Sequence, residues 1–299
     1  MNDHPPVEHS NAQNFCALPA EHAAWNASRV AVLPVPYDLT TSYQPGARRG
    51  PQAMIEASWQ LELYDTELGT EPFEVGIHTL PPLEPLVSGP RAMAERVAQA
   101  VGQVLEAGKF PIVLGGDHAV THGVVRAIDE RHVPFSVLQL DAHADLRDRY
   151  QGSQWSHATV GRRISERAPL VQLGVRSFSA EEAAFLDQAN VLSVSARAWH
   201  EDHDAVERAL EQLQSPVYIT VDLDVFDPAI MPATGTPEPG GLGWYQVLTL
   251  LRRVFETRTV VGCDVVELAP LPGTIAPDFL AAKLVYKLVA YWQRSTPSI

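Results

Sequence analysis

Residues 135–145 read Phe-Ser-Val-Leu-Gln-Leu-Asp-Ala-His-Ala-Asp, an apolar run typical of a β-strand that ends in alternating polar residues. Successive side chains of a strand point to opposite faces, so we expect Asp141 and His143 to emerge on the same side. Buried charges at a strand end cost several kcal/mol unless they are paired or bind a metal ion. On these residues alone, a metal site and a polar strand end that has reached solvent are equally good interpretations.

The rest of the chain alternates between apolar strand patterns and amphipathic helix patterns. Strands are predicted at 29–37, 110–114, 135–140, 170–175, 191–194, 217–221 and 259–265. Helices are predicted at 52–64, 90–107, 121–131, 157–167, 180–188, 202–213, 243–255 and 275–292. This alternation indicates an α/β fold with a mainly parallel sheet covered on both faces. A doubly wound sheet is the simplest interpretation and a closed barrel is the alternative, and both place a site at the carboxyl ends of the strands.

Acids and histidines follow four of these predicted strands. They are Asp117 and His118 after 110–114, Asp141, His143 and Asp145 after 135–140, Asp222 and Asp224 after 217–221, and Asp264 and Glu267 at or beyond the end of 259–265. Because a parallel sheet brings such ends together, a metal site becomes the favoured interpretation. Six such groups, four carboxylates and two imidazoles, would converge there as a donor set. We expect Asp117, Asp227 and Asp264 to support these ligands or to cap turns.

The predicted donor set of four carboxylates and two imidazoles limits the choice of metal. Zinc prefers tetrahedral sites rich in nitrogen and sulfur, and calcium prefers shells made only of oxygen. Mixed ligands with shared carboxylates suit a pair of Mn²⁺ ions, while nickel, cobalt and iron stay open.

The bulk composition is that of a globular protein, with 299 residues of which 45% are hydrophobic and 19% are charged. Its 22 basic and 36 acidic residues give a net charge of −14, which argues against nucleic acid or an anionic membrane as partner. With two distant cysteines, Cys16 and Cys263, and no signal-peptide pattern, we expect a cytoplasmic protein. We expect residues 1–28 to form an N-terminal arm, mobile or packed against another subunit, and residues 29–299 to form a single domain.

Five short motifs resemble those of the ureohydrolases, the family that includes arginase and agmatinase. They are Gly-Gly-Asp-His at 115–118, Asp-Ala-His-Ala-Asp at 141–145, Asp-Leu-Asp at 222–224, Gly-Thr-Pro at 235–237 and Val-Val-Glu at 265–267. The resemblance covers roughly residues 29–292. It implies the arginase-like three-layer α/β/α sandwich with a mainly parallel, eight-stranded sheet, and a homo-trimer or homo-hexamer.

The resemblance also implies a role for each predicted ligand. One Mn²⁺ would be held by His118, Asp141, Asp145 and Asp222, and the other by Asp141, His143, Asp222 and Asp224, with Asp141 and Asp222 bridging. Two ions that share a water molecule lower its pKa from 15.7 towards about 7, which suits attack on the unreactive guanidinium carbon. Asp145 is implied as proton acceptor, His157 as proton shuttle and Glu267 as the guanidinium-binding residue.

The loop at 146–157 is expected to select the small guanidino substrate. It lacks the Ser- and Asn-rich pattern of arginase and looks like the prokaryotic agmatinase branch, so we expect a polyamine-pathway enzyme that cleaves agmatine to putrescine and urea. Aminopropylagmatine, guanidinobutyrate, arginine and other guanidines are alternatives, because Arg149 and Gln151 replace residues that are often acidic in agmatinase-like relatives. A binuclear phosphoesterase and a non-catalytic regulator are alternatives of a different class. The carboxylate of Glu267 disfavours the phosphoesterase, and the full set of ligands together with Glu267 and His157 disfavours the regulator.

Overall fold

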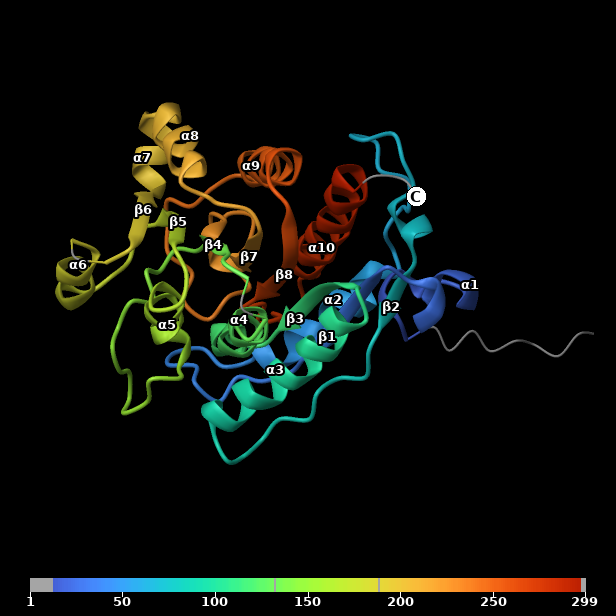
Figure 1. Ribbon diagram of the computed structural model, residues 1–299, viewed down its shortest axis with the longest axis horizontal. Helices are drawn as coiled ribbons and strands as arrows, with labels where there is room; N and C mark the ends of the chain where they lie inside the picture. The colour runs from blue at the N-terminus through green and yellow to red at the C-terminus, as the bar shows by residue number, and fades with distance from the viewer. Residues whose placement is uncertain (1–12, 132, 188, 297–299) are drawn as a thin grey trace, which may run out of the picture.

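The computed structural model describes residues 13–131, 133–187 and 189–296. Within these residues, eight strands form one sheet of order β2-β1-β3-β8-β7-β4-β5-β6, and every neighbouring pair is parallel (Figure 1). The strands are β1 (Val30–Val35), β2 (Ile77–Thr79), β3 (Phe110–Gly115), β4 (Ser136–Leu140), β5 (Leu170–Val175), β6 (Val191–Ser195), β7 (Val217–Asp222) and β8 (Val260–Val266). The predicted α/β fold is confirmed, and the open edges at β2 and β6 exclude the closed barrel.

Helices cover both faces of this sheet, and a hydrophobic core lies under each layer. The α-helices are α1 (Ala20–Ala23), α2 (Gly50–Ser58), α3 (Pro90–Glu106), α4 (Thr121–Asp129), α5 (Val160–Ser165), α6 (Ala180–Leu186), α7 (Ala196–Glu201), α8 (His203–Glu211), α9 (Trp244–Thr257) and α10 (Ala276–Ser295). Alternate strand residues supply the two cores: in β3, Ile112 and Leu114 join the larger core, while Val113 joins the smaller one. This alternation follows from the period of two in strand side chains.

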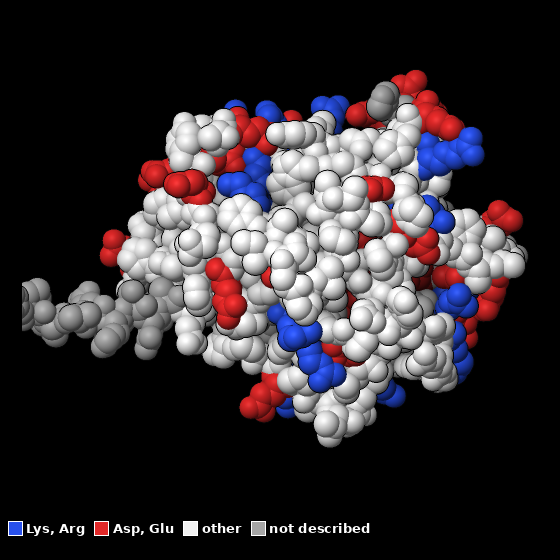
Figure 2. All heavy atoms as spheres, turned by 180° about the vertical axis from the view of Figure 1, so that it is seen from behind, with Lys and Arg blue, Asp and Glu red and all other residues white. Residues whose placement is uncertain are grey.

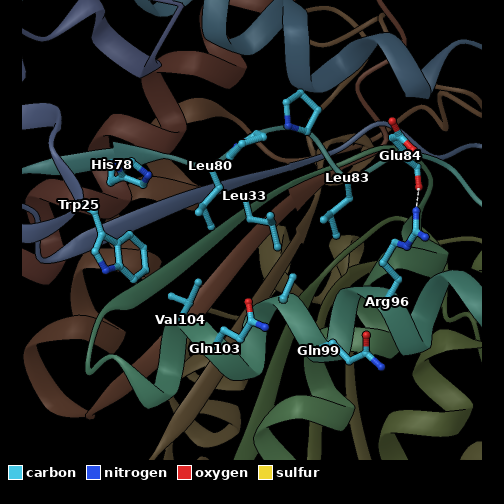
Figure 3. A pocket seen from close by; sticks show the side chains of 13 residues that line it. Trp25, Leu33, His78, Leu80, Leu83, Glu84, Arg96, Gln99, Gln103 and Val104 are labelled. Atoms are coloured by element: carbon cyan, nitrogen blue, oxygen red, sulfur yellow. Dashed lines mark hydrogen bonds between the residues drawn. The ribbon is translucent and has the colours of Figure 1, made fainter.

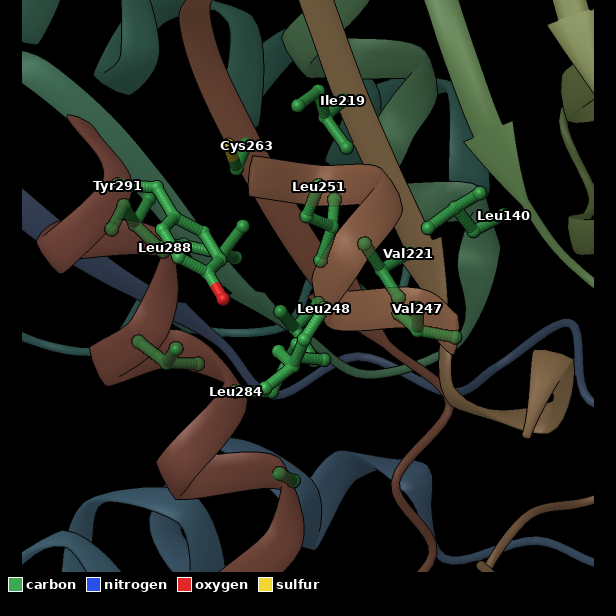
Figure 4. Packing of buried hydrophobic residues seen from close by; sticks show 14 of the residues in the cluster. Leu140, Ile219, Val221, Val247, Leu248, Leu251, Cys263, Leu284, Leu288 and Tyr291 are labelled. Carbon is green, nitrogen blue, oxygen red and sulfur yellow. The ribbon is translucent and has the colours of Figure 1, made fainter. Parts of the chain in front are cut away.

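The larger core is densely packed where α9 and α10 lie against the middle of the sheet (Figure 4). Leu251 of α9, Leu284 of α10 and Ile219 of β7 belong to the same cluster, and all three side chains are buried. Each fully buried side chain of this size contributes about 1.5–3 kcal/mol of hydrophobic stabilisation. The centre of the sheet is therefore a rigid support for whatever its strand ends hold.

Several predicted boundaries differ from the structure. Strand β2 was not predicted, because three residues are too short to show a periodic pattern. Helix α2 ends at Ser58, so the predicted helix at 52–64 was too long. Asp202 has an extended backbone and accepts the Asp204 N–H as an N-cap, so a separate helix, α7, precedes the predicted helix at 202–213.

Residues 13–28, which the sequence assigned to an N-terminal arm, pack against the domain. Phe15 is fully buried in the larger core, and its backbone N–H donates to Thr79 Oγ1 at 2.9 Å. The Cys16 N–H donates to Ser58 Oγ at 2.7 Å. The packed domain therefore includes part of the predicted arm, and residues 1–12 of that arm lie outside the described residues.

The outer surface carries charges of both signs. On the face shown in Figure 2, Lys and Arg side chains of the described residues stand in small separate groups between acidic groups and wide uncharged areas. No helix in the described part of the chain is both long and apolar enough to cross a membrane.

Candidate metal centre

The three strands that lead to the predicted ligands and the strand that leads to Glu267 are neighbours in the sheet, in the order β3-β8-β7-β4. Their parallel register places Leu114 beside Val265, Val265 beside Val221, and Val221 beside Leu140. The carboxyl ends of the four strands therefore lie side by side. This arrangement brings together side chains that are far apart in the sequence.

His118 stands at the centre of a first group of ligands. Its Nδ1 atom lies 3.1 Å from an Asp141 carboxylate oxygen, 3.3 Å from Asp145 and 3.3 Å from Asp222. All four side chains are buried, yet Nδ1 has no hydrogen-bond partner among the described residues. An imidazole nitrogen facing three carboxylates is the kind of donor set that a divalent metal ion prefers.

A second group lies next to the first and shares one of its residues. His143 Nδ1 lies 2.9 Å from Asp224 Oδ2 and 3.7 Å from Asp141 Oδ1. Asp141 therefore presents Oδ2 to His118 and Oδ1 to His143. Donor atoms of His118, Asp141 and Asp145 lie within 4.8 Å of one another, and the same holds for Asp141, His143 and Asp224. Two adjacent ions that share Asp141 would fit this geometry.

The carboxylates of the first group repel one another when no cation is present. Burial raises the pKa of Asp145 to about 7, and the charge of Asp141 adds to this increase. Burial and the charges of Asp224 and Asp141 raise the pKa of Asp222 well above its usual range. Buried carboxylates with raised pKa values need positive charge nearby, which divalent ions would provide. The residues present therefore fit a metal centre.

The ring of His118 is oriented by a buried chain through Thr220, which the sequence did not single out, to Asp264. Its Nε2 atom lies 2.9 Å from Thr220 Oγ1, and the Thr220 hydroxyl donates to Asp264 Oδ1 at 2.5 Å. Because the hydroxyl hydrogen points to Asp264, Thr220 accepts the Nε2–H of His118. The Nδ1 lone pair of the neutral ring is then free for a metal ion. Asp264 also accepts hydrogen bonds from Tyr218 and Thr121, and it lies within β8 rather than among the metal-facing groups.

Two site residues adopt a backbone conformation that is rare outside glycine. Asp145 has φ of 52° and Glu267 has φ of 66°. Such left-handed conformations cost about 1–2 kcal/mol per residue, and strained positions of this kind cluster at functional sites. The Glu267 N–H donates to Gly116 O at 2.8 Å, and its Oε1 accepts the His118 N–H at 2.7 Å. These bonds hold the Glu267 side chain beside the metal-facing groups.

His157 also lies at this site, at the start of the 3₁₀ helix η6 (His157–Thr159). Its Nδ1 atom lies 3.2 Å from Thr40 Oγ1, and its ring contacts the edge of Tyr150 with the ring centres 5.5 Å apart. Burial lowers the pKa of His157 to about 4. The imidazole is therefore neutral at pH 7.

The site consists of a narrow cleft and a wider cavity beside it. The cleft has a volume of 20 Å³, which is enough for an ion or a water molecule. Its lining includes five of the six candidate ligands, His118, His143, Asp145, Asp222 and Asp224, together with His157, Gly235 and Glu267. The cavity has a volume of 230 Å³ and shares His143, Asp145 and His157 with the cleft. Its outer wall contains Arg147, Tyr150, Ser177, Phe178, Ser179 and Glu182.

Only some residues of the loop at 146–157, which was expected to select the substrate, line the wider cavity. Arg147 lines it, with its Nε atom 3.7 Å from Glu182 Oε2, whereas Arg149 is not among its lining residues and has a side chain that is 61% exposed. Glu182 was not predicted as a site residue. It follows β5, and its position beside the loop at 146–157 depends on the order of strands in the sheet.

A larger cavity lies elsewhere, between residues 78–84 and helix α3 (Figure 3). Its volume is 560 Å³, and its lining is mostly apolar, with Trp25, Leu33 and Leu80 among its residues. Arg96 there donates to the backbone oxygen of Glu84 at 2.9 Å. Because none of the metal-facing groups line this cavity, it is not the candidate site.

Comparison with known proteins identifies similar chains. A model of the arginase family matches residues 28–290. The chain is 44% identical over 275 residues to an N(1)-aminopropylagmatine ureohydrolase of Synechocystis sp., which covers 89% of this chain and 90% of that protein. It is 36% identical to an agmatinase of Pyrococcus horikoshii, over 86% of this chain and 90% of that protein. The crystal structure of an agmatine ureohydrolase of Thermoplasma volcanium has a TM-score of 0.83 and 31% identity, covering 95% and 94% of the two chains.

Proposed function

The chain belongs to the arginase family, and we propose that it is a metal-dependent hydrolase that releases urea from a small guanidino compound. The observation that supports this most strongly is the buried His118 Nδ1 atom, which faces three carboxylates beside a second group that shares Asp141. Such paired sites suit hydrolysis of unreactive carbon centres. A phosphoesterase would need basic groups to meet its anionic substrate, whereas this cleft is lined by carboxylates that include Glu267.

We propose that two Mn²⁺ ions bind at this centre. One would be held by His118, Asp141, Asp145 and Asp222, and the other by Asp141, His143, Asp222 and Asp224. Imidazole and carboxylate donors suit Mn²⁺, and nickel, cobalt or iron would accept the same set. When bound, the ions supply Lewis-acid chemistry that lowers the pKa of water and polarises the substrate.

Glu267 would bind the guanidinium group of the substrate. Its Oε1 atom is occupied by the His118 N–H, and Oε2 faces Gly235 in the cleft. A carboxylate oxygen in this position would accept charge-assisted hydrogen bonds from guanidinium N–H groups. It would turn the carbon of the substrate towards the metal-facing groups.

Asp145 and His157 would move the protons of the reaction. The oxygen of water forms a bond to the guanidinium carbon, the bond from that carbon to the alkyl-bearing nitrogen breaks, and both protons of water end on the departing amine. Asp145 would accept the first proton at its carboxylate. His157 would carry a proton at Nε2 towards the leaving nitrogen.

We propose agmatine as substrate, with its aminopropyl derivative as the main alternative. The similar proteins named as aminopropylagmatine ureohydrolase and agmatinase support this choice. The 230 Å³ cavity that continues from the cleft offers room for an alkylamine chain beyond the guanidinium group. Glu182 in its wall would favour an amine at the far end of the chain, and Arg147 beside it would favour a carboxylate.

The test is urea release by the Mn²⁺-loaded protein from agmatine, aminopropylagmatine, arginine and guanidinobutyrate. We expect the highest kcat/KM for one of the first two compounds. Metal content is measured on the same sample, and p-nitrophenyl phosphate serves as the substrate of the competing reaction class. If metal is bound and no guanidino compound releases urea, the proposed function is wrong.

We further propose that the protein is cytoplasmic and assembles as a homo-trimer or homo-hexamer. Cys16 and Cys263 are both buried and form no disulfide, as suits a reducing compartment. Tyr245 and Ile275 are each 80% exposed and offer apolar surface for a subunit contact. Light scattering after gel filtration measures the oligomeric state, and a monomer at micromolar concentration would contradict the proposal.

A further inference from the structure

Thr40 lies between Asp117 and His157, and its hydroxyl contacts both side chains. The Thr40 hydroxyl donates to Asp117 Oδ2 at 2.7 Å, and the Thr40 backbone N–H donates to the same oxygen at 2.8 Å. On its other side, Thr40 Oγ1 accepts the His157 backbone N–H at 3.0 Å and lies 3.2 Å from His157 Nδ1. Asp117 and Thr40 are both buried, so solvent does not compete for these bonds.

The hydrogen atoms at Thr40 can be assigned from these contacts. A hydroxyl has one hydrogen to donate and two lone pairs to accept with. The hydrogen points to the Asp117 carboxylate, and one lone pair accepts the His157 backbone N–H. The remaining lone pair faces His157 Nδ1, and two facing lone pairs would repel, so Nδ1 must hold a hydrogen.

We propose that Asp117 and Thr40 are positioning residues that hold His157 in its Nδ1–H tautomer, so that the unprotonated Nε2 serves the cleft. The importance of this tautomer for catalysis rests on the proposed function, in which Nε2 moves a proton. With the other tautomer, Nε2 would already hold a hydrogen and could not accept one. The contact partner of the ring nitrogen thus decides which end of the imidazole is reactive.

The backbone around Gly116 is shaped to permit this contact. A side chain at residue 116 would place its Cβ 1.7 Å from Tyr37 O, so the loop that follows β1 approaches closely only because residue 116 is glycine. The Asp117 N–H donates to Tyr37 O at 2.7 Å. This close packing brings Thr40, 77 residues away in the sequence, onto the Asp117 carboxylate.

The first test is the tautomer of His157 in the metal-free protein, read from ¹⁵N spectra of histidine-labelled samples. A His157→Gln variant identifies the signals. We expect the wild-type ring to show a protonated Nδ1 and an unprotonated Nε2, and this requires no variant at Thr40. A wild-type Nε2–H tautomer would overturn the proposal.

Three variants near the ring extend the test. Thr40→Val keeps the shape and removes the hydroxyl, so we expect the Nε2–H tautomer to gain population, whereas Thr40→Ser keeps the wild-type spectrum. Thr41→Val is the matched control, because Thr41 Oγ1 is buried without a hydrogen-bond partner in the described structure. An unchanged tautomer in a folded Thr40→Val protein, or an equal change in Thr41→Val, would refute the role of Thr40.

Kinetics of the Mn²⁺-loaded enzyme separate this proposal from the proposed function. We expect Thr40→Val to lower kcat roughly 10–100-fold, as outer partners of functional histidines typically do, with little change in KM and with rescue by Thr40→Ser. A loss in Thr40→Val that Thr40→Ser does not restore would contradict the positioning role. If the wild-type enzyme releases no urea, the proposed function fails, while the tautomer measurement still decides the assignment of Thr40.

Discussion

Replacing Thr220 by valine tests whether the Asp264–Thr220 chain orients His118 for metal binding. Valine fills the same space in β7 but cannot accept the His118 Nε2–H, which is 2.9 Å from Thr220 Oγ1 in a fully buried position. A buried donor without a partner costs about 1–3 kcal/mol. The neutral ring would then be more stable with its hydrogen on Nδ1 or with the ring turned. Either change leaves no Nδ1 lone pair facing the carboxylates.

The expected result is a 10–100-fold loss of Mn²⁺ affinity, equivalent to about 1.4–2.8 kcal/mol. Titration calorimetry of the chelator-treated protein measures this loss directly, without reference to turnover. Thr220→Ser keeps the hydroxyl and should bind as the wild type does. Thr121→Val removes a different donor from Asp264 without touching His118, so its affinity should fall less. Wild-type affinity in a folded Thr220→Val protein would refute the reasoning.

Three further predictions concern substrate, packing and pH. Glu267→Gln should weaken substrate handling, with higher KM and lower kcat in urea release, while Mn²⁺ content stays at the wild-type value. Gly116→Ala should lower the free energy of unfolding, measured with denaturant, by more than about 4 kcal/mol, because the new Cβ would overlap a backbone oxygen. Gly102→Ala, where a Cβ meets no atom on α3, should raise the free energy of unfolding by about 0.5–1 kcal/mol. Burial raises the pKa of Asp145 to about 7, and despite burial a neighbouring aspartate raises the pKa of His143 to about 11. Both pKa values lie above the ordinary values of about 3.9 and 6.5, so the folded protein binds these protons more tightly than the unfolded chain does. The free energy of unfolding of the metal-free protein, measured with urea, should therefore fall as the pH rises from about 5 to about 9. A free energy of unfolding that rises over this range would contradict the prediction.

The fold and the convergence of the candidate ligands were predictable because their signals are local. Asp141 and His143 are two residues apart at the end of an apolar run, and Asp222 and Asp224 repeat that spacing. Because strands and helices alternate, the sheet is parallel, and the carboxyl ends of all its strands lie along the same edge. Strand β2 and helix α7 were missed for the opposite reason: three residues have no measurable period, and Asp202 interrupts a pattern that reads as one helix.

The threonines that orient the two histidines could not be predicted from the sequence. Thr220 reads as a β-branched strand residue and Thr40 as a loop residue, and each has many equivalents in the chain. Their roles depend on partners 102 and 117 residues away, which only the packed sheet brings within 3.2 Å. Both nevertheless make the same arrangement, a carboxylate that takes the hydroxyl hydrogen and a ring N–H that the hydroxyl accepts. The result differs with the nitrogen that is held: His118 is left with a free Nδ1 for a metal ion, and His157 with a free Nε2 for a proton. The sequence motifs thus determine which functional groups meet, and the buried threonines determine which atom of each histidine is reactive.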